Sequence, residues 1–367
     1  MYRHYARTLK RLHAQLHELR EAPFSRTDLL LEIQETLIRK MKHVEARIRD
    51  AKRPKDLDLA LRYQRLLHAL KTIGDGLAFL YINRWDIKPL ARNNRPGFIS
   101  GKSGFVQELK VLRRGIRFGP VLLADLTNCL RHGDIYAFRE DSFPAIIELK
   151  SSRGGGRAQR QKKRLRNVRE YLNTDRAEGT IIKNHILIRR ETTIDLVEHV
   201  DEFNSLISQA VNEGSVYGSP EKGVLYVVDN GEDSEIPIQH IKELKEPICL
   251  FVNAEKYTLI DFVPFSLTIR DAEAFLRFLE GSLLVVVAFD ADVIRRSFRD
   301  KGLTVEFMED SDWFMKLSAE DRGFFQVSRN FVGRVACEFL SLNWMIEELA
   351  SRYTAVVLGA DDLHPAV

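Results

Sequence analysis

Residues 133–138 read GDIYAF and residues 144–150 read PAIIELK, with a short polar turn between them. This pattern predicts a β-hairpin with Asp134 at the head of its first strand and Glu148 and Lys150 at the tail of its second. Side chains two apart in a strand share a face, so Glu148 and Lys150 point the same way. Two carboxylates and an ammonium on one side of a hairpin suit a divalent cation and a phosphate.

The elements predicted around the hairpin follow a definite order. An amphipathic helix begins near Phe105 and ends at Gly115, and a basic helix spans 158–172 after a glycine-rich loop. The strands are expected at Val121–Leu126, Asp134–Phe138, Ala145–Lys150 and Thr180–Ile188. The predicted order is therefore helix, three-stranded meander, helix, strand.

This order and its acids resemble the PD-(D/E)xK nuclease superfamily, with its restriction-endonuclease-like fold. The resemblance covers residues 104–190, about a quarter of the chain. Such nucleases carry a Glu in the first helix, an acid at the start of the second strand and an acid-x-Lys in the third. The resemblance therefore implies the catalytic residues Glu108, Asp134, Glu148 and Lys150.

Many members of that superfamily also have a Gln in the following helix. Gln161 fits this position, and Gln159 fits it less well. One branch of the superfamily has a Tyr four residues after the Gln, where this chain has Leu165. The chain is therefore not assigned to that branch.

The chemistry of phosphodiester hydrolysis suits the same residues. Mg²⁺, with Mn²⁺ as the alternative, prefers carboxylate and carbonyl oxygens, which Asp134, Glu148 and the Leu149 carbonyl provide. Lys150 would orient the water or bind the phosphate. Glu108 would hold a second metal ion or a metal-bound water. The alternative is a surface hairpin with a cross-strand ion pair.

Asp125 is a rival acid in the strand before the hairpin. Its apolar neighbours and the Thr127-Asn128 turn after it favour a structural role. His132 precedes Asp134 by two residues and is interpreted as a turn residue. His13 and His17 lie one helical turn apart but lack a third metal ligand, so we expect them on the surface.

The basic helix and the loop before it favour contact with a phosphate backbone. Eight cations and no acid lie between residues 153 and 169, which predicts salt-sensitive binding of a polyanion. A solvated helix face is the alternative. The expected substrate-binding residues are Gln161, Arg153, Arg157, Arg160, Lys162, Lys163 and Arg164, with Arg166 and Arg169 completing the cationic set.

Charge is distributed very unevenly along the chain. Residues 1–190 contain 41 of the 56 Lys and Arg but only 20 of the 52 Asp and Glu. The basic part predicts a polyanionic partner, and the acidic part either faces away from that partner or covers the basic face. Three domains are expected: a helical domain at 1–95, the nuclease-like core at 96–190 and an acidic α/β domain at 191–367.

The flanking domains give simpler patterns. Leucine spacing predicts three helices before residue 92. The acidic domain is expected to contain strands at Val224–Asp229, Ile248–Val252 and Leu283–Ala288, and helices at Ala272–Leu279 and Phe331–Ala350. The overall expectation is an α/β protein with a restriction-endonuclease-like core between an N-terminal helical domain and a C-terminal mixed α/β region.

Several function classes are excluded or disfavoured. The sequence GKS at residues 101–103 is similar to the end of a P-loop, but the first Gly of that motif would fall on Pro96. The first residues lack the apolar stretch of a signal peptide, and the apolar run from Leu283 to Phe289 is too short for a bilayer. Three scattered cysteines predict buried reduced thiols in a cytoplasmic protein.

The pattern as a whole predicts a Mg²⁺-dependent DNA endonuclease, with DNA favoured over RNA as its substrate. The resemblance alone suggests a role in bacterial phage defence or restriction. No membrane partner is expected, while a second copy of the chain or a regulatory protein is an alternative further partner. The competing hypothesis is a catalytically silent subunit that keeps the fold and binds nucleic acid or assembles with other chains.

Overall fold

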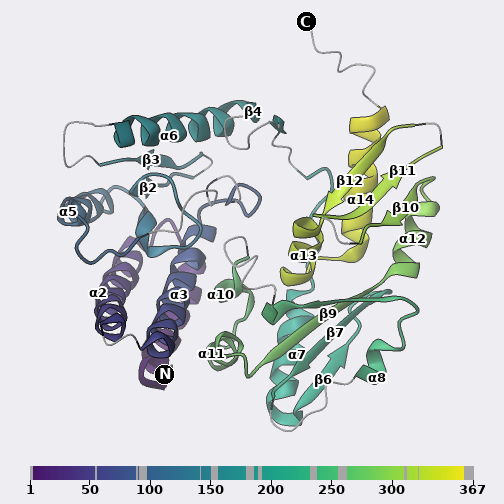
Figure 1. Cartoon of the computed structure of the whole chain (residues 1–367), viewed down its shortest axis with the longest axis horizontal. Coiled ribbons are helices and arrows are strands. Elements are labelled where there is room, and N and C mark those ends of the chain that lie inside the picture. Colours follow the sequence, from purple (N-terminus) through teal and green to yellow (C-terminus); the bar gives the residue numbers. More distant parts are fainter. Residues whose placement is uncertain are drawn as a thin grey trace, which may run out of the picture. The chain divides into compact units, whose positions relative to one another are not determined.

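The computed structural model divides the chain into two compact units. Unit 1 contains residues 1–190 and 264–276, and unit 2 contains 191–263 and 277–367 (Figure 1). The residues that the structure describes are 3–53, 56–87, 90, 97–140, 142–149, 156–178, 186–188, 192–231, 238–254, 263–309, 312–320 and 322–358.

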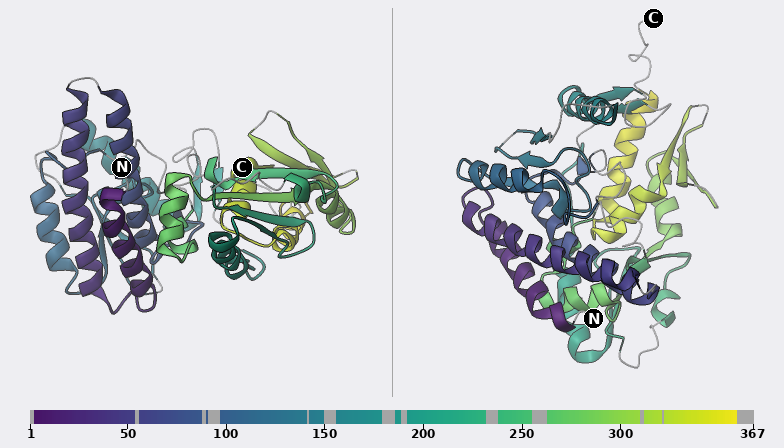
Figure 2. Two further views of the ribbon diagram at one scale, coloured as in Figure 1. Left: turned by 90° about the horizontal axis from the view of Figure 1, so that it is seen from below. Right: turned by 60° about the vertical axis from the view of Figure 1, so that its left-hand side comes forward.

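Unit 1 begins with three helices that pack on one another, as predicted (Figure 2). Leu9, Leu12 and Leu16 are fully buried on the first helix, and Leu30, Ile33 and Leu37 on the second, because the spacing of three and four residues places each set on one face. Leu57 and Leu61 are exposed, so the buried face of the third helix starts later than the leucine pattern suggests. The helices are α1 (Arg3–Arg20), α2 (Thr27–Lys52) and α3 (Leu57–Phe79).

A three-stranded antiparallel meander follows helix α5 (Phe105–Gly115). The predicted hairpin is confirmed, with Tyr136 opposite Ile146, although its strands are shorter than expected. The predicted strand at Val121–Leu126 is only half correct, since Ala124–Leu126 form the 3₁₀ turn η1. The strands are β1 (Val121–Leu123), β2 (Ile135–Ala137) and β3 (Ala145–Ile147).

The basic helix α6 (Gly156–Thr174) lies on the opposite side of the meander from α2 and α3 (Figure 1). Its Arg169 guanidinium donates a hydrogen bond to the Ile146 carbonyl of β3. After α6, β4 (Arg176–Glu178) pairs with β5 (Ile186–Ile188) in a two-stranded sheet. Among the described residues, β5 does not join the meander as a fourth strand.

A segment from later in the chain completes unit 1. It carries α10 (Phe265–Thr268) and the start of α11 (Ala272–Glu280). His13 Nε2 donates to the Ile269 carbonyl at 2.9 Å, and His17 Nε2 donates to the Ser266 carbonyl at 3.1 Å. His13 is buried and stacks on Phe275, so the prediction of a surface histidine was wrong for His13, whereas His17 is half-buried. Helix periodicity did not show that a distant segment covers this face of α1.

The four-stranded antiparallel sheet of unit 2 has the order β6-β7-β9-β8. The central strands β7 and β9 are almost entirely buried, as expected for their continuous apolar runs. Phe203 of α7 stacks on Phe339 beneath this sheet. The elements are α7 (Val200–Glu213), β6 (Ser215–Gly218), β7 (Val224–Asp229), α8 (Ile238–Ile241), β8 (Pro247–Phe251) and β9 (Leu284–Asp290).

A three-stranded antiparallel sheet and three helices complete unit 2. The predicted single helix at Phe331–Ala350 is two helices, because Phe339 adopts a positive φ and Ser341 caps a new helix through the Trp344 amide. The elements are α12 (Ala291–Arg299), β10 (Thr304–Phe307), β11 (Trp313–Ser318), β12 (Phe324–Ser328), α13 (Arg329–Cys337), α14 (Leu342–Tyr353) and the π-helical turn η3 (Thr354–Leu358).

The protein is therefore a mixed α/β protein with small antiparallel sheets, as the sequence predicted at that level. The thiols of Cys129, Cys249 and Cys337 are free. Cys129 and Cys337 are buried, whereas Cys249 on β8 is exposed, so the expectation that all three are buried was wrong for Cys249.

Candidate carboxylate and lysine site

Three carboxylates of unit 1 converge on one ammonium group. Lys102 Nζ lies 2.9 Å from Glu108 Oε1, 2.7 Å from Asp125 Oδ2 and 2.9 Å from Asp134 Oδ1. The exposed fraction of the Glu108 side chain is 3%, against 18% for Asp125, 12% for Asp134 and 29% for Lys102. We call these four residues the carboxylate cluster. Ion pairs of this length with shielded partners are stronger than ordinary surface pairs.

Asp134 is held at the entrance of β2 by backbone geometry. Gly133, with φ of 73°, has no room for a side chain, because a Cβ there would lie 2.5 Å from the Ile146 side chain. The Asp134 amide donates to the Ile147 carbonyl at 2.8 Å, and its Oδ2 accepts from the Leu149 amide at 2.8 Å. With its other oxygen on Lys102, this carboxylate is fixed at both ends.

Asp125 belongs to the cluster although the sequence favoured a structural role for it. It lies on η1, and α3 packs closely against that turn, since a Cβ on Gly74 would lie 2.0 Å from the Leu126 carbonyl oxygen. The 3₁₀ turn takes Asp125 out of the strand pattern on which the sequence prediction depended. Its carboxylate points to Lys102, as that of Asp134 does.

Buried polar side chains from α2 and α3 fix the backbone around the cluster. Glu45 accepts the amides of Ile99 and Ser100 at 2.9 and 2.8 Å, just before Lys102. Asp75 accepts three hydrogen bonds of 2.6–2.9 Å, from the amide and side chain of Asn128 and from the Cys129 amide. A buried carboxylate that accepts several N–H donors locks a loop, because losing it leaves each donor unpaired.

A third such residue, Gln34 of α2, bonds the free edge of β1. Its Nε2 donates to the Val121 carbonyl at 2.8 Å, and its Oε1 accepts from the Leu123 amide at 3.1 Å. The intervening residue, Leu122, pairs with Tyr136 of β2 on the other edge of the strand. The meander and α2 are therefore joined by hydrogen bonds from a side chain to the backbone as well as by apolar packing.

The electrostatics of the cluster reflect burial and mutual charge. Burial opposes the charge on Lys102, but attraction to Asp125, Asp134 and Glu108 outweighs it and raises the pKa of the ammonium. Burial raises the pKa of the Glu108 carboxyl above its ordinary value, although Lys102 acts in the opposite direction. Glu108 is therefore the member of the cluster that takes up a proton more readily than an exposed Glu does.

Lys71 of α3 is a second buried lysine close to these charges. It is 4% exposed, and its Nζ has no hydrogen-bond partner among the residues that the structure describes. Burial lowers the pKa of this ammonium, while Asp125 and then Asp75 and Glu45 partly counteract the shift. Lys71 was not predicted as a site residue, because it lies among the apolar residues of the third predicted helix.

The structure describes only part of the predicted acid-x-Lys motif. The pairing of β2 with β3 ends with Ile135 opposite Ile147, and beyond it the Asp134 amide donates to the Ile147 carbonyl. Glu148 is half-buried. Lys150 and Arg153 lie outside the described residues. That Asp134 and Glu148 lie on one side of the hairpin stays a prediction.

The donor set of the cluster matches a hard divalent cation in its chemistry. Three carboxylates from three separate elements supply oxygen ligands and negative charge, as Mg²⁺ or Mn²⁺ requires. As arranged, however, the three carboxylate oxygens surround the Lys102 nitrogen at ion-pair distances of 2.7–2.9 Å. An Mg²⁺ ion at the position of that nitrogen would need its oxygen ligands closer, at ~2.0–2.1 Å. Within the described ranges, no three His, Cys, Asp or Glu are arranged to hold a metal ion.

The predicted substrate-binding residues lie on α6 except Arg153. Lys163 is exposed on that helix. The side chains of Arg157, Arg160, Gln161, Lys162 and Arg164 are outside the described set, so the structure places only their helix. His132, read as a turn residue, is buried beside the entrance of β2.

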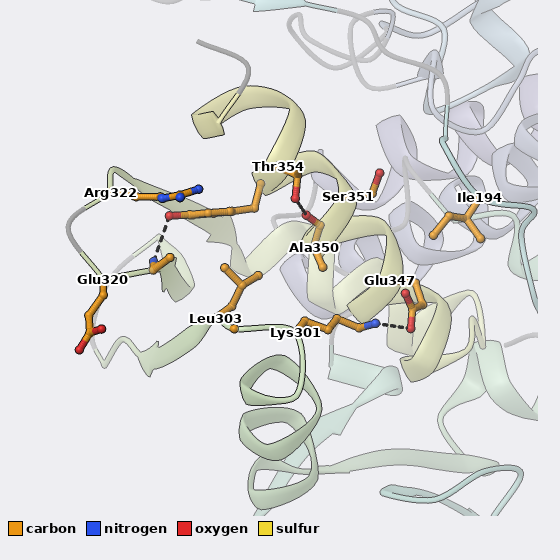
Figure 3. A pocket seen from close by; sticks show the side chains of 12 residues that line it. Ile194, Lys301, Leu303, Glu320, Arg322, Glu347, Ala350, Ser351 and Thr354 are labelled. Atoms are coloured by element: carbon orange, nitrogen blue, oxygen red, sulfur yellow. Dashed lines mark hydrogen bonds and ion pairs between the residues drawn. The ribbon is translucent and has the colours of Figure 1, made fainter. Parts of the chain in front are cut away.

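A separate pocket of about 570 Å³ lies within unit 2 (Figure 3). Lys301 and Glu347 form a 2.5 Å ion pair on its wall, and Tyr353 Oη accepts from the Ala319 amide at 3.0 Å. Arg322 and Glu320 lie on the opposite side in Figure 3. We call this site the unit 2 pocket.

No family model, curated protein or solved structure matches this chain. Among the described helices, none combines the length and the apolar character needed to cross a membrane. The case for function therefore depends on the residues of the chain itself.

The sequence pattern singled out Glu108 and Asp134, which both lie in the carboxylate cluster, and missed Lys102. Lys102 belongs to the GKS sequence at 101–103, whose similarity to the end of a P-loop does not indicate an ion pair with Glu108. One signal was available: Lys102 lies six residues before Glu108, close enough for the helix and the preceding turn to bring the two together.

Proposed function

We propose that unit 1 is a divalent-metal-dependent nuclease, with Mg²⁺ as the ion and DNA as the favoured substrate. The observation that carries this proposal is the convergence of Glu108, Asp125 and Asp134 within hydrogen-bonding distance of one cationic atom. A cluster of buried like charges is costly to fold unless it serves a ligand or a reaction. A restriction-endonuclease-like core, with α5, the meander and α6 as its shared elements, is part of the proposal.

The carboxylates of Asp134, Asp125 and Glu108 would hold the ion, and Glu148, which follows the last residue of β3, remains a predicted further ligand. When bound, such an ion activates water and neutralises charge on the phosphate. The residues of the chain supply position: Gly133 and the Leu149 amide orient Asp134, and the Asp75 hydrogen bonds fix the segment after Asp125. Lys150 remains the expected phosphate-binding or water-orienting residue.

The basic helix supports nucleic acid as the substrate class. Helix α6 lies against the meander that carries Asp134, and its sequence from 156 to 169 contains only basic charges. Such a helix attracts a phosphate backbone without reading bases. A role in phage defence or restriction remains an expectation of the resemblance alone.

The direct test of this function is cleavage by the purified full chain. We expect supercoiled plasmid to be nicked or linearised with Mg²⁺ or Mn²⁺ and to remain intact with EDTA. Linear and single-stranded DNA, and RNA, run in parallel would define the substrate. Glu108→Gln should reduce the rate at least about 100-fold, as expected when a metal ligand loses its charge. Equal cleavage with and without EDTA would contradict the proposal.

The role of α6 is tested by binding at several salt concentrations. Neutralising Arg160, Lys162, Lys163 and Arg164 together should weaken DNA affinity and flatten its dependence on salt, because fewer counterions are released. Cleavage at saturating DNA should fall less than affinity. Identical salt slopes for this variant and the unchanged chain would show that α6 is simply solvated.

One observation favours the catalytically silent alternative. The position between the three carboxylates is taken by Lys102, which neutralises part of their charge without any ion. A protein that only binds nucleic acid could keep such a cluster as a structural ion-pair network. Binding of DNA with no metal-dependent cleavage on any substrate would establish that alternative.

A further inference from the structure

Helix α5 lies at the edge of unit 1, beside the meander, and has two chemically different faces (Figure 1). Its buried residues are Phe105, Glu108 and Leu112, at spacings of three and four. The residues of the opposite face follow the same spacing through the end of the helix, and all are exposed: Gln107, Lys110, Arg114 and Arg117. The helix that contributes Glu108 to the carboxylate cluster therefore turns a basic face outward.

The cations of this outward face are not neutralised by the protein. Among the described residues, Lys110, Arg114 and Arg117 have no acidic partner. Arg113 differs from them, because it faces α2 and pairs with Glu35 at 2.9 Å. The positive charge of the outward face is thus available to phosphate groups from outside the chain.

An uncovered aromatic ring adjoins these cations. Phe118 follows Arg117 in the turn between α5 and β1, and its side chain is 92% exposed, more than any other large apolar side chain in the described part of the chain. The Phe118 amide donates to the Gly115 carbonyl at 2.9 Å, which fixes the turn. Within the described residues, no aromatic ring or cation packs on the phenyl ring. A single exposed apolar side chain is ordinary, but here it stands on an anchored turn at the end of a row of cations.

We propose that Gln107, Lys110, Arg114, Arg117 and Phe118, here called the α5 face, bind an unpaired strand of nucleic acid. The cations contact its phosphates, and the ring of Phe118 stacks on one of its bases. This inference depends on the proposed function, since it names the form of the nucleic acid that unit 1 would hold.

The phenyl ring favours an unpaired strand over a duplex. In a duplex, neighbouring bases cover both faces of each base, whereas an unpaired strand offers a free face at every nucleotide, whatever its sequence. The row of cations has a suitable length. Lys110 and Arg117 are seven residues apart, or about 10 Å along a helix, which matches about three phosphates of a stacked strand at about 3.4 Å each.

The α5 face is poorly suited to a membrane surface. A helix that lies on a membrane inserts a continuous apolar face, but the apolar face of α5 is buried within unit 1. The exposed apolar side chains Val106 and Phe118 lie near opposite ends of the helix. An acidic protein segment would match the cations, but it would leave the ring without a role.

The test is binding of fluorescently labelled strands to the full chain, measured by anisotropy in EDTA so that metal-dependent cleavage cannot occur. The first probe is a thymidine strand of about 12 nucleotides. Phe118→Ala should weaken its binding roughly fivefold or more, because stacking on one base is lost. Phe118→Trp keeps an aromatic ring and should retain the affinity. Phe324→Ala is the matched control, since Phe324 of β12 is an exposed phenylalanine of unit 2, and it should leave the affinity unchanged.

Two further probes of the same length separate stacking from charge. A sugar-phosphate strand without bases and a duplex carry phosphates but offer no free base to the ring, so Phe118→Ala should change their affinity less than about twofold. Lys110→Gln combined with Arg114→Gln should weaken binding of the strands with and without bases alike and flatten the salt dependence, because fewer counterions are released. All these side chains are exposed, and circular dichroism would establish that each variant is folded.

Several results would overturn the inference. They are equal affinity of Phe118→Ala and the unchanged chain for the thymidine strand, an equal loss with and without bases, and absence of thymidine-strand binding by the unchanged chain. A loss confined to the duplex would assign the face to paired DNA instead. Tighter binding of polyglutamate than of the thymidine strand would indicate an acidic protein as the partner and would likewise overturn it.

Failure of the inference and failure of the nuclease proposal are distinguishable. Binding in EDTA does not depend on cleavage, so Phe118-dependent binding without metal-dependent cleavage of any substrate would overturn the nuclease and leave the α5 face as a binding site. Metal-dependent plasmid cleavage with no effect of Phe118→Ala on strand binding would overturn only the role of the α5 face.

Discussion

The carboxylate cluster of unit 1 and the unit 2 pocket contain the same kinds of charged residue in opposite settings. In the cluster, Lys102 contacts three shielded carboxylates that other elements hold in place. In the pocket, Lys301 pairs with the largely exposed Glu347, and Arg322 is exposed. Solvent screens the second arrangement, and water can replace its ion pair at little cost. Burial and anchoring, more than charge, therefore distinguish a built site from a surface cavity.

The largest difference between the two regions is expected in the rate of plasmid cleavage after a substitution in the carboxylate cluster. Asp134→Asn keeps the shape of the side chain but removes the charge opposite Lys102. We expect Mg²⁺-dependent plasmid cleavage to fall at least about 100-fold, since a metal ligand has lost its charge. Glu347→Gln in the unit 2 pocket is the control and should change the rate less than about twofold. Similar rates in both variants would remove the distinction between the two regions.

The next effect concerns the support behind the cluster. Asp75→Ala leaves buried donors of Asn128 and Cys129 without their acceptor. We expect the free energy of unfolding, measured with urea, to fall by about 3 kcal/mol. Asp75→Asn keeps one acceptor oxygen and should lose clearly less. A fall of under about 1 kcal/mol in Asp75→Ala would show that this carboxylate does not anchor the loop.

Some of the residues in and behind the cluster could be predicted from the sequence, and others could not. The hairpin, Glu108 and Asp134 were predictable because alternation and helix spacing are local patterns within a few residues. The roles of Asp75, Gln34 and Glu45 were not, because each depends on a contact with residues more than 50 positions away. The predicted position of Asp125 in a strand was wrong, since a 3₁₀ turn interrupts a run that reads as a strand.

The four-stranded sheet of unit 2 and the face of α1 give the same lesson. The positions of β7 and β9 followed from their continuous apolar runs, which bury both faces. The burial of His13 could not be predicted, since the segment that covers it comes from residues 264–276. Local periodicity shows where an element lies, whereas tertiary contacts decide which polar side chains are buried.

A somewhat smaller effect on the free energy of unfolding is expected from protonation of the buried His13. The solvent-exposed charges of unit 2 should not have such an effect. Burial, followed by repulsion from His17, lowers the pKa of His13 to about 4, against partial compensation by the Ile269 carbonyl and Asp271. The unfolded chain, with an ordinary His pKa near 6.5, therefore binds the proton more readily. Stability is fully present above about pH 6.5 and declines as pH falls toward 4.

The size of this loss follows from the difference in pKa and is about 2–3 kcal/mol. The measurement is the free energy of unfolding between pH 7.5 and 4 for the unchanged chain and for His13→Gln, which cannot titrate. His17, Arg20, Arg270, Asp271 and Glu21 surround the histidine pair and are present in both proteins. Parallel curves for the two proteins would contradict the prediction.

The smallest effect is expected in the unit 2 pocket. Lys301→Ala removes a partly exposed ion pair with Glu347. Such pairs contribute about 0–1 kcal/mol, so the free energy of unfolding should change by less than about 1 kcal/mol, and plasmid cleavage should not change. A loss as large as that of Asp75→Ala would show that the pocket is anchored as firmly as the cluster.

The side chain of Gln34 has a consequence beyond support of β1. Its amide presents one donor and one acceptor to the two outward-facing backbone groups of that strand, Val121 O and Leu123 N. It imitates the peptide group of a neighbouring strand without being part of one. An open strand edge is a template on which a strand of another molecule can pair, leading to strand exchange or aggregation. At β1 that template is already occupied, so the meander ends there by hydrogen bonding, and any added strand would first have to displace a helix residue.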